Sequence, residues 1–210
     1  MRPEALDDTQ SNRSFTTSAR REQITRAAVD VLAEHGYTGT SFSAIAERVG
    51  VSKGVLSYHF SDKADLLQAV VRFVLEQAAA WMRPRIEGAD SYRDGLRRYI
   101  TANVSFLATH ATEIAALTEV LANARATPGV PEIFEQSQTE ATHALEALFA
   151  GGQKAGEFGR VPPTILAMSL RATIDATSAR LRADPEFDLA EFQGNLIELF
   201  EQASALGPRS

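Results

Sequence analysis

The stretch that decides the fold runs from Phe42 to Phe60 and has the sequence FSAIAERVGVSKGVLSYHF. Apolar residues recur at helical spacing in its first half: Phe42, Ile45, Ala46 and Val49. Ser41 precedes them, and a serine at this position accepts one of the unpaired N–H groups of a helix start. Gly50 suits the left-handed conformation of a helix end, and Ser52 stands as the cap of a second helix. Two capped helices joined by a three-residue turn predict a helix-turn-helix.

The second helix of this motif leaves a polar face open. The helix needs only three apolar residues to pack against the rest of the domain: Val55, Leu56 and Phe60. Its other residues are small, polar or aromatic. The residues free to face outward are Lys53, Gly54, Ser57, Tyr58 and His59. A cation for phosphate and hydrogen-bonding groups for base edges suit the DNA major groove. The alternative is a structural corner between two helices, in which Tyr58 and His59 are ordinary surface groups.

The preceding segment supplies the helix that braces the motif. Thr17 or Ser18 caps it, and Gly36 ends it. Its apolar stripe is Ile24, Ala27, Ala28, Val31 and Leu32. Residues 17–62 are therefore expected to form a three-helix DNA-binding domain. Residues 1–16 are polar and without helical period, which predicts a disordered arm. Arg13, Arg20 and Arg21 at its junction with the helix are placed to reach phosphate or the minor groove, and the alternative for Arg13 is a solvated tail.

The segment Thr25–Leu67 resembles the DNA-binding domain of the TetR (tetracycline-repressor-like) transcriptional regulators. The matching positions are Ala27-Ala28, Val31-Leu32, Gly36-Tyr37, Ser41-Phe42, Ile45-Ala46, Gly50 to Gly54, Tyr58-His59-Phe60, Lys63 and Leu66-Leu67. Two positions depart from the family pattern: Val55 replaces the usual threonine, and Ser57 replaces a common tyrosine. The resemblance therefore implies no phosphate contact from a tyrosine at position 57.

The residues expected to contact DNA lie in and around the motif. They are Arg20, Thr40, Ser41, Ser43, Ser52, Lys53, Gly54, Ser57, Tyr58, His59 and Lys63. Lys63 follows Asp62, the expected cap of the next helix, where a cation opposes the helix dipole. A DNA phosphate beside the lysine would account for that placement.

Charge is divided unevenly along the chain. The net charge is −6, but residues 13–63 hold seven basic against five acidic groups, and residues 64–210 hold thirteen against nineteen. This division places the phosphate-facing end in the N-terminal part. Because the excess is small, non-specific DNA affinity should be modest and should fall steeply with salt.

Composition and motif searches narrow the class of protein. Apolar residues make up 44% of the chain, which excludes general disorder. Neither a cysteine nor an 18-residue apolar run is present, so the sequence predicts no disulfide and no membrane span, and a cytoplasmic location. Glu140-x-x-His143 matches half of a di-iron signature, but a second copy is missing. We therefore expect no enzyme, metal or cofactor.

From Lys63 onward, the sequence predicts helix after helix. One helix over 62–82, ended by Pro84, connects the DNA-binding domain to the rest. Later helices are expected over 92–110, 112–124, 132–155, 163–182 and 188–206. No segment alternates with period two, so the fold class is all-α, with about nine helices. Residues 63–210 are expected to form an effector-binding and dimerisation domain.

The last two helices suit self-association. The final helix has a wide apolar stripe, and the helix before it keeps one small surface. The predicted dimer interface is Ala172, Ala176, Ala179, Phe192, Leu196, Leu199, Phe200 and Ala203. Two such helices suit a four-helix seam across a two-fold axis, and the resemblance implies the same, because TetR-like proteins dimerise through their last two long helices. The alternative is that the stripe is buried within its own domain.

Polar residues on otherwise apolar helical faces predict a mixed cavity in the second domain. Asn103 and His110 continue an apolar stripe, and Arg171 and Asp175 stand one turn apart. The candidate ligand-binding residues are Trp81, Tyr99, Asn103, Phe106, His110, Phe134, Met168, Arg171 and Asp175. Buried polar groups need partners, which are either one another or a bound effector. The resemblance implies such a cavity, but no motif marks its residues.

Taken together, these observations predict a homodimeric repressor that binds double-stranded operator DNA and leaves it when a small-molecule effector binds. The competing prediction is an all-α small-molecule carrier or interaction module whose helix-turn-helix corner is structural.

Overall fold

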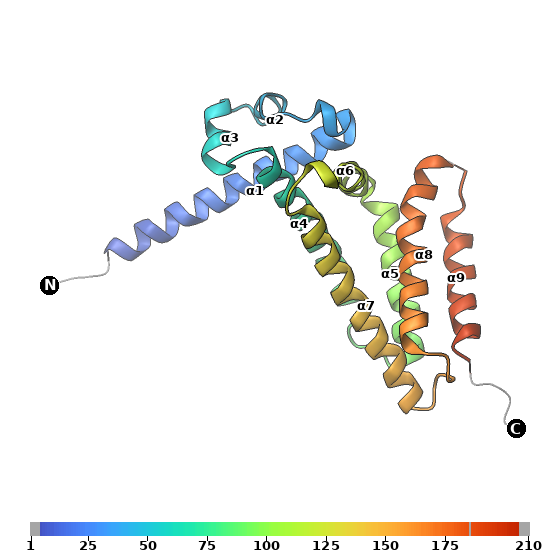
Figure 1. Cartoon of the computed structure of the whole chain (residues 1–210). Coiled ribbons are helices and arrows are strands. Elements are labelled where there is room, and N and C mark those ends of the chain that lie inside the picture. The colour runs from blue at the N-terminus through green and yellow to red at the C-terminus, as the bar shows by residue number, and fades with distance from the viewer. Residues whose placement is uncertain (1–4, 185, 206–210) are drawn as a thin grey trace, which may run out of the picture. The chain divides into compact units, whose positions relative to one another are not determined.

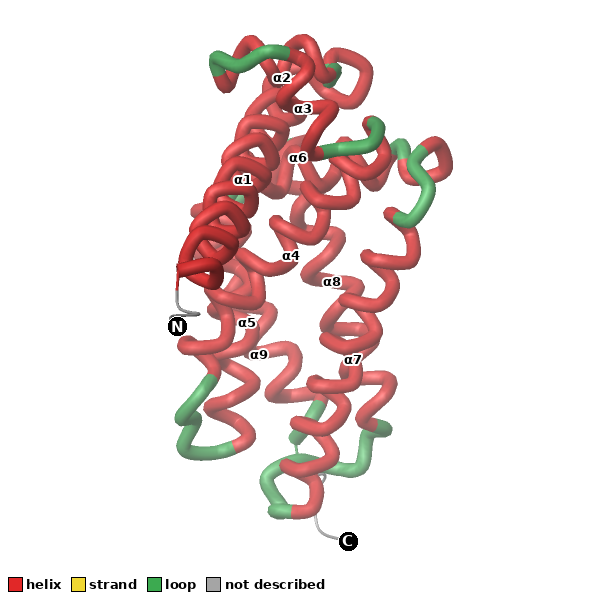
Figure 2. The backbone as a smooth tube through the Cα atoms, turned by 90° about the vertical axis from the view of Figure 1, so that its left-hand side faces the viewer, coloured by secondary structure: helices red, strands yellow, loops and turns green. Residues whose placement is uncertain are grey.

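The structure, a computed structural model, describes residues 5–184 and 186–205, with the side chains of residues 5–16 and 182 left out of that description. All its regular elements are helices, which confirms the predicted fold class (Figures 1 and 2). They are α1 (Ala5–Gly39), α2 (Phe42–Val49), α3 (Lys53–His59), α4 (Lys63–Ile86), α5 (Tyr92–Thr109), α6 (Ala111–Ala122), the 3-10 helix η1 (Ala124–Ala126), α7 (Val130–Lys154), α8 (Pro163–Ala183) and α9 (Leu189–Ala203). Within the described ranges, no helix is both long and apolar enough to cross a membrane.

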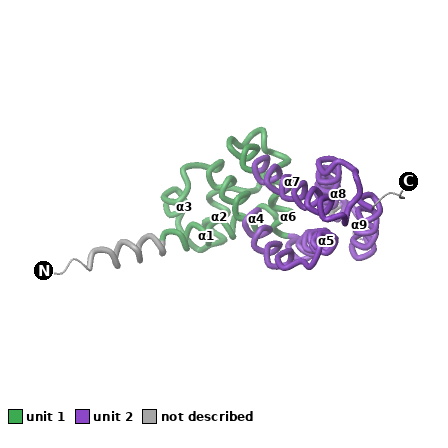
Figure 3. The backbone as a smooth tube through the Cα atoms, turned by 90° about the horizontal axis from the view of Figure 1, so that it is seen from below, with its two compact units in different colours: residues 1–74, 112–133 green, residues 75–111, 134–210 purple. Residues whose placement is uncertain are grey.

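The chain forms two compact units, coloured separately in Figure 3. Unit 1 contains residues 1–74 and 112–133, and unit 2 contains residues 75–111 and 134–210. This division differs from the expected boundary at residue 62, because α6 and η1 group with the N-terminal helices. Tyr37 joins α1 to this segment: its N–H donates to Glu119 of α6 (3.1 Å), and its hydroxyl lies 3.1 Å from that of Thr127.

The capping residues of the helix-turn-helix lie where the sequence predicted them, and one of them does not form the expected hydrogen bond. The Ser41 hydroxyl accepts a hydrogen bond from the Ala44 N–H (3.2 Å), and Gly50 has the left-handed φ of 71° that ends α2. Ser52 occupies the N-cap position of α3, but its side chain makes no capping hydrogen bond. The two short helices pack against α1 within unit 1. They bury Ile45 and Ala46 of α2 and Leu56 of α3.

Helix α1 begins earlier than expected. The predicted disordered arm over residues 1–16 is wrong for residues 5–16, which are helical, and residues 1–4 lie outside the described residues. Residues 5–16 contain neither glycine nor proline, and extending an existing helix costs far less free energy than nucleating a new one. The predicted break at Gly36 is confirmed by its φ of 68° and ψ of −177°, a conformation open essentially to glycine alone.

Pro84 lies inside α4 and does not end it, contrary to the sequence prediction. A proline removes one hydrogen bond of the helix, but near the end of a helix the turn can be held by other contacts. The Arg85 guanidinium lies 3.4 Å from the centre of the Trp81 ring and donates to the Trp81 carbonyl (2.7 Å). These contacts support the last turn across the proline.

The core of unit 2 gathers side chains from α5, α7, α8 and α9. Its buried members are Leu96, Tyr99, Ile100, Val104, Leu145, Phe149, Phe158, Leu166, Ala167, Leu170, Ile174, Leu196 and Phe200. Helices α8 and α9 lie side by side, and both contact α5 (Figure 1). The side chains of α8 that point away from this core are therefore free to form another surface.

Candidate DNA interface and effector site

The polar face of α3 is open to solvent. Tyr58 is 78% exposed, and Lys53, Gly54, Ser52 and Ser57 are exposed beside it. On the opposite side, Leu56 and Phe60 are buried, so the helix is held from behind. The arrangement presents hydroxyls and one cation on a seven-residue helix, as the sequence predicted.

His59 is only partly exposed, at the end of the same helix. Desolvation and the nearby charges of Arg21 and Arg20 lower the pKa of its imidazole. The ring is therefore neutral at pH 7 and can offer a hydrogen bond, but not a charge, to DNA. It packs edge-on against Tyr58, with 5.1 Å between ring centres.

The residues around α3 divide into two groups. Ser41 and Ser43 are exposed at the start of α2, and Arg20 is exposed on α1, where it donates to Gln23 (2.7 Å). Thr40 is buried instead, with 1% exposure, and its hydroxyl donates to the Gly36 carbonyl (2.8 Å). The assignment of Thr40 to DNA is therefore wrong in this structure, because its side chain has no access to a phosphate.

Lys63 has an internal partner that the sequence did not suggest. Its ammonium donates to the Tyr37 carbonyl (2.7 Å) and lies 4.1 Å from the centre of the Tyr37 ring. This interaction accounts for a lysine in the first turn of α4 without a DNA phosphate. Lys63 thus joins α4 to the end of α1.

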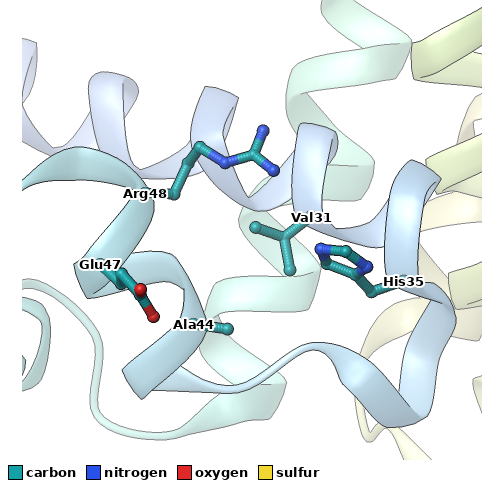
Figure 4. Close-up of a pocket in the computed structure, with 5 residues that line it drawn as sticks. All are labelled: Val31, His35, Ala44, Glu47 and Arg48. Atoms are coloured by element: carbon teal, nitrogen blue, oxygen red, sulfur yellow. The ribbon is translucent and has the colours of Figure 1, made fainter.

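Unit 1 also contains a surface cavity of about 290 Å³ between α1 and α2. Its lining residues are Val31, His35, Ala44, Glu47 and Arg48 (Figure 4). Arg48 pairs with both carboxylate oxygens of Glu34 in this region. The sequence analysis did not single out these residues, since they form no recognisable motif.

In unit 2, Arg171 gathers most of the predicted polar residues into one network. Its guanidinium donates to the Tyr99 hydroxyl (3.0 Å), Asn103 (3.3 Å), Gln138 (3.0 Å) and Asp175 (2.6 Å). Its Nε is buried and has no hydrogen-bond partner among the residues that the structure describes. Burial raises the pKa of the Asp175 carboxyl, although Arg171 and Gln138 act against that shift. Gln138 was not among the predicted residues, because no sequence pattern distinguishes it from the other polar residues of α7.

A second cluster in unit 2 is aromatic. The rings of Phe106 and His110 stack with 4.2 Å between centres, and Trp81 meets His110 edge-on at 4.8 Å. The Trp81 indole donates to the Ser105 hydroxyl (3.2 Å). Within the described residues, no three His, Asp or Glu side chains converge as metal ligands.

Two predicted ligand-binding residues stand apart from these clusters. Met168 is 57% exposed on the outer side of α8, so its assignment to an interior cavity is wrong. Phe134 is half-buried, without an aromatic contact to Trp81 or Phe106. For Met168, the helical pattern gave the helix correctly but not the side of the helix that faces the core.

The predicted dimer residues divide between the core of unit 2 and an exposed surface. Leu196 and Phe200 are only 3% and 4% exposed, and Phe192 packs against the same core. The assignment of Leu196 and Phe200 to the interface is wrong, since they are buried in unit 2, whereas Phe192 is only partly buried and its assignment stays a prediction. The remaining residues are exposed: Ala172, Ala176, Ala179, Leu199 and Ala203. Ile165 and Met168 continue the stripe of alanines on α8, and we call all seven exposed residues the outer face.

Comparisons with known proteins agree with this architecture. A structure of a transcriptional regulator from Saccharomonospora viridis in complex with choline is 20% identical, with a TM-score of 0.82 over 90% of this chain and 100% of that one. A TetR transcription regulator from Haloarcula marismortui is 23% identical, with a TM-score of 0.81 over 90% of this chain and 99% of that one. At these identities, the likeness shows the fold.

Sequence matches are more specific. The HTH-type transcriptional regulator BetI of Burkholderia thailandensis is 38% identical over 85 residues, which span 40% of this chain and 44% of the relative. The matched stretch thus covers less than half of that protein. Residues 24–70 match the profile of bacterial regulatory proteins of the tetR family, and residues 92–202 match that of the BetI-type transcriptional repressor C-terminal region. The chain therefore belongs to the tetR family of bacterial regulatory proteins and, by its C-terminal region, to the BetI type of repressor.

Proposed function

We propose that this protein is a homodimeric transcriptional repressor that binds operator DNA through α3 and is released by a small molecule bound in unit 2. The observation that carries the proposal is the open polar face of α3, where Tyr58 is 78% exposed on a helix anchored from behind. An exposed tyrosine beside exposed hydroxyls and a lysine forms a surface suited to base edges and phosphates. Such a repressor would act in the cytoplasm, on the nucleoid.

In this proposal, α3 enters the major groove and the start of α2 meets the backbone. Tyr58 and Ser57 lie nearest the bases, whereas Lys53, Ser41 and Ser43 contact phosphate. His59, neutral at pH 7, supplies a hydrogen bond. Arg20 contacts the backbone from α1. One helix of this length contacts too few base pairs to be selective, so two copies are needed.

Tyr58→Ala is expected to cost about 1–3 kcal/mol in operator binding, because the lost contact is made to DNA alone. The melting temperature should stay nearly unchanged, since Tyr58 is exposed and little of its ring is buried on folding. Fluorescence anisotropy with labelled operator measures the first effect, and circular dichroism measures the second. A folded Tyr58→Ala protein with wild-type operator affinity would remove Tyr58 from the interface.

The dimer is proposed to form through the outer face. Its alanines on α8 let two helices approach closely, and Ile165, Met168 and Leu199, each more than half exposed, supply apolar area around them. The two recognition helices are thereby set at a fixed separation, which the operator half-sites must match. The inward residues Leu196 and Phe200 support this surface without belonging to it.

The effector is proposed to bind in unit 2 at the aromatic cluster and the Arg171 network. Trp81 and His110 are partly exposed, and aromatic rings attract organic cations, although the Arg85 guanidinium already covers one face of Trp81. Asp175 lies 43% exposed and supplies a counter-charge. Choline is the first compound to test, because the Saccharomonospora viridis relative was solved with it. Helix α4 crosses from unit 1 to unit 2 between Val74 and Leu75, so a change in unit 2 can pass along it to α3.

Choline at a hundred times its dissociation constant is expected to stabilise the protein by about 2.7 kcal/mol per site and to weaken operator binding. His110→Leu removes the stacked ring at a partly exposed position and should abolish both effects while leaving operator affinity without choline unchanged. His143→Leu, at an exposed position on α7, is the matched control and should respond like wild type. A compound whose effect survives both His110→Leu and Asp175→Asn would show that the effector site lies elsewhere.

A further inference from the structure

Helix α3 needs support at its C-terminal end. It has seven residues, one of them fully buried, and its N-cap residue Ser52 makes no side-chain capping hydrogen bond within the described chain. A single helix of this length is unstable in water by itself, because its hydrogen bonds do not offset the cost of nucleation. Its last carbonyl groups also lack partners within the helix. The direction in which α3 presents Tyr58 must therefore be fixed by contacts from other elements.

Arg21 of α1 supplies such contacts. Its Nη1 donates to the His59 carbonyl, at the last residue of α3. Its guanidinium also lies 4.0 Å from the centre of the ring of Phe60, the buried residue that ends the helix. A cation hydrogen-bonded to the C-terminal carbonyls of a helix satisfies an unpaired acceptor and favours the helix dipole. Arg21 thus caps the recognition helix from a neighbouring helix.

Asp65 of α4 fixes the other edge of the same guanidinium. Its carboxylate accepts from Nη2 of Arg21 (2.8 Å) and from the Ser61 N–H (3.1 Å). Although partial burial acts to raise the pKa of Asp65, the hydrogen bonds from Arg21 and Ser61 lower it, so the group is ionised at neutral pH. One guanidinium and one carboxylate therefore join α1, the end of α3 and the start of α4.

We infer that Arg21 is a positioning residue for DNA recognition: it sets the orientation of α3 by holding the His59 carbonyl, while Asp65 holds Arg21. The inference rests on the proposed function and assigns Arg21 a role other than the phosphate contact suggested by its place in a basic segment. Both its terminal nitrogens are engaged within unit 1, whereas the exposed Arg20 beside it donates to Gln23 in the same helix.

Two variants of the full-length protein, Arg21→Lys and Asp65→Asn, distinguish the positioning role of Arg21 from a direct phosphate contact. Lysine keeps the positive charge, but its single ammonium cannot replace the planar fork that joins His59 and Asp65. Asparagine keeps the shape of Asp65 and removes a negative charge near DNA. Simple electrostatics thus predicts unchanged binding for Arg21→Lys and tighter binding for Asp65→Asn, whereas positioning predicts weaker operator binding for both.

The measurement is anisotropy titration with an operator selected by the wild-type protein from random DNA, and with a scrambled duplex, at several salt concentrations. Each variant is expected to lose about tenfold in operator affinity, the order of one lost charge-assisted hydrogen bond. Affinity for scrambled DNA should stay at the wild-type value for Arg21→Lys and should not fall for Asp65→Asn, and the salt slope should stay unchanged for both. The double variant should bind the operator no worse than either single one. Loss of stability alone would not change the ratio of operator to scrambled affinity in folded protein. Arg26→Lys, at an exposed arginine of α1 paired with Glu22, is the matched control.

Wild-type operator affinity in both Arg21→Lys and Asp65→Asn would overturn the inference. So would an Arg21→Ala variant that weakens operator and scrambled DNA equally and flattens the salt slope by about one unit, because that is the signature of a direct phosphate contact. Failure of the proposed function gives a different result: the wild-type protein would then select no sequence and would bind operator and scrambled DNA alike.

Discussion

Ala176→Glu combined with Leu199→Glu is expected to convert the protein into a folded monomer without sequence-specific DNA binding. Both residues lie on the outer face, and Leu199 is 57% exposed in a single chain. Dimerisation through this face would bury four added carboxylates, two from each copy, and an unpaired buried charge costs several kcal/mol. Glutamate is a good helix former, so the fold of each chain should remain.

Light scattering after size exclusion measures the mass, and anisotropy titration measures DNA binding. Operator affinity should fall to the level of scrambled DNA, about a thousandfold or more below that of the wild-type protein. Ala144→Glu combined with Ala147→Glu adds the same charge at exposed positions of α7 and should change neither property. A dimer that persists at micromolar concentration with both outer-face substitutions would place the interface elsewhere.

Leu196→Glu and Phe200→Glu, on the inner side of the same helix, are expected to unfold unit 2. These side chains are 3% and 4% exposed and pack in the core with Ile100, Phe149 and Leu170. Each substitution removes core packing and buries a charge without a partner, at a cost of several kcal/mol. That cost is a large share of the roughly 5–15 kcal/mol by which a domain is stable.

Far-UV circular dichroism during thermal unfolding tests this expectation, with Ala147→Glu, at an exposed position of α7, as the control. Ala147→Glu should melt close to the wild-type temperature, whereas Leu196→Glu should lose helix content or melt far lower. A cooperative Leu196→Glu transition within a few degrees of wild type would show that α9 packs in another way.

The helix-turn-helix was predictable because its determinants are local. Ser41 caps α2 and Gly50 ends it through properties of single residues and their near neighbours. The same holds for the break at Gly36. Pro84 shows the limit of this reasoning, since the contacts of Arg85 with Trp81 let α4 continue past a residue that ends most helices.

Side-chain partners far apart in the sequence were not predictable. Lys63 and Thr40 looked suited to DNA by type and position, but the Tyr37 and Gly36 carbonyls engage them. The stripe of α9 is wide enough to permit either burial or self-association, and only the three-dimensional packing shows that Leu196 lies inward and Leu199 outward. The Arg171 network gathers residues from α5, α7 and α8, and helical periodicity sets no pairing between those helices.

The central claim is that the open face of α3 recognises one DNA sequence. Its most direct test is anisotropy titration of the wild-type protein and Tyr58→Ala with the selected operator and with a scrambled duplex at physiological salt. We predict that the wild-type protein binds the operator at least about a thousandfold more tightly than the scrambled duplex, and that Tyr58→Ala loses about 1–3 kcal/mol on the operator alone. Equal wild-type affinity for the two duplexes would contradict the claim.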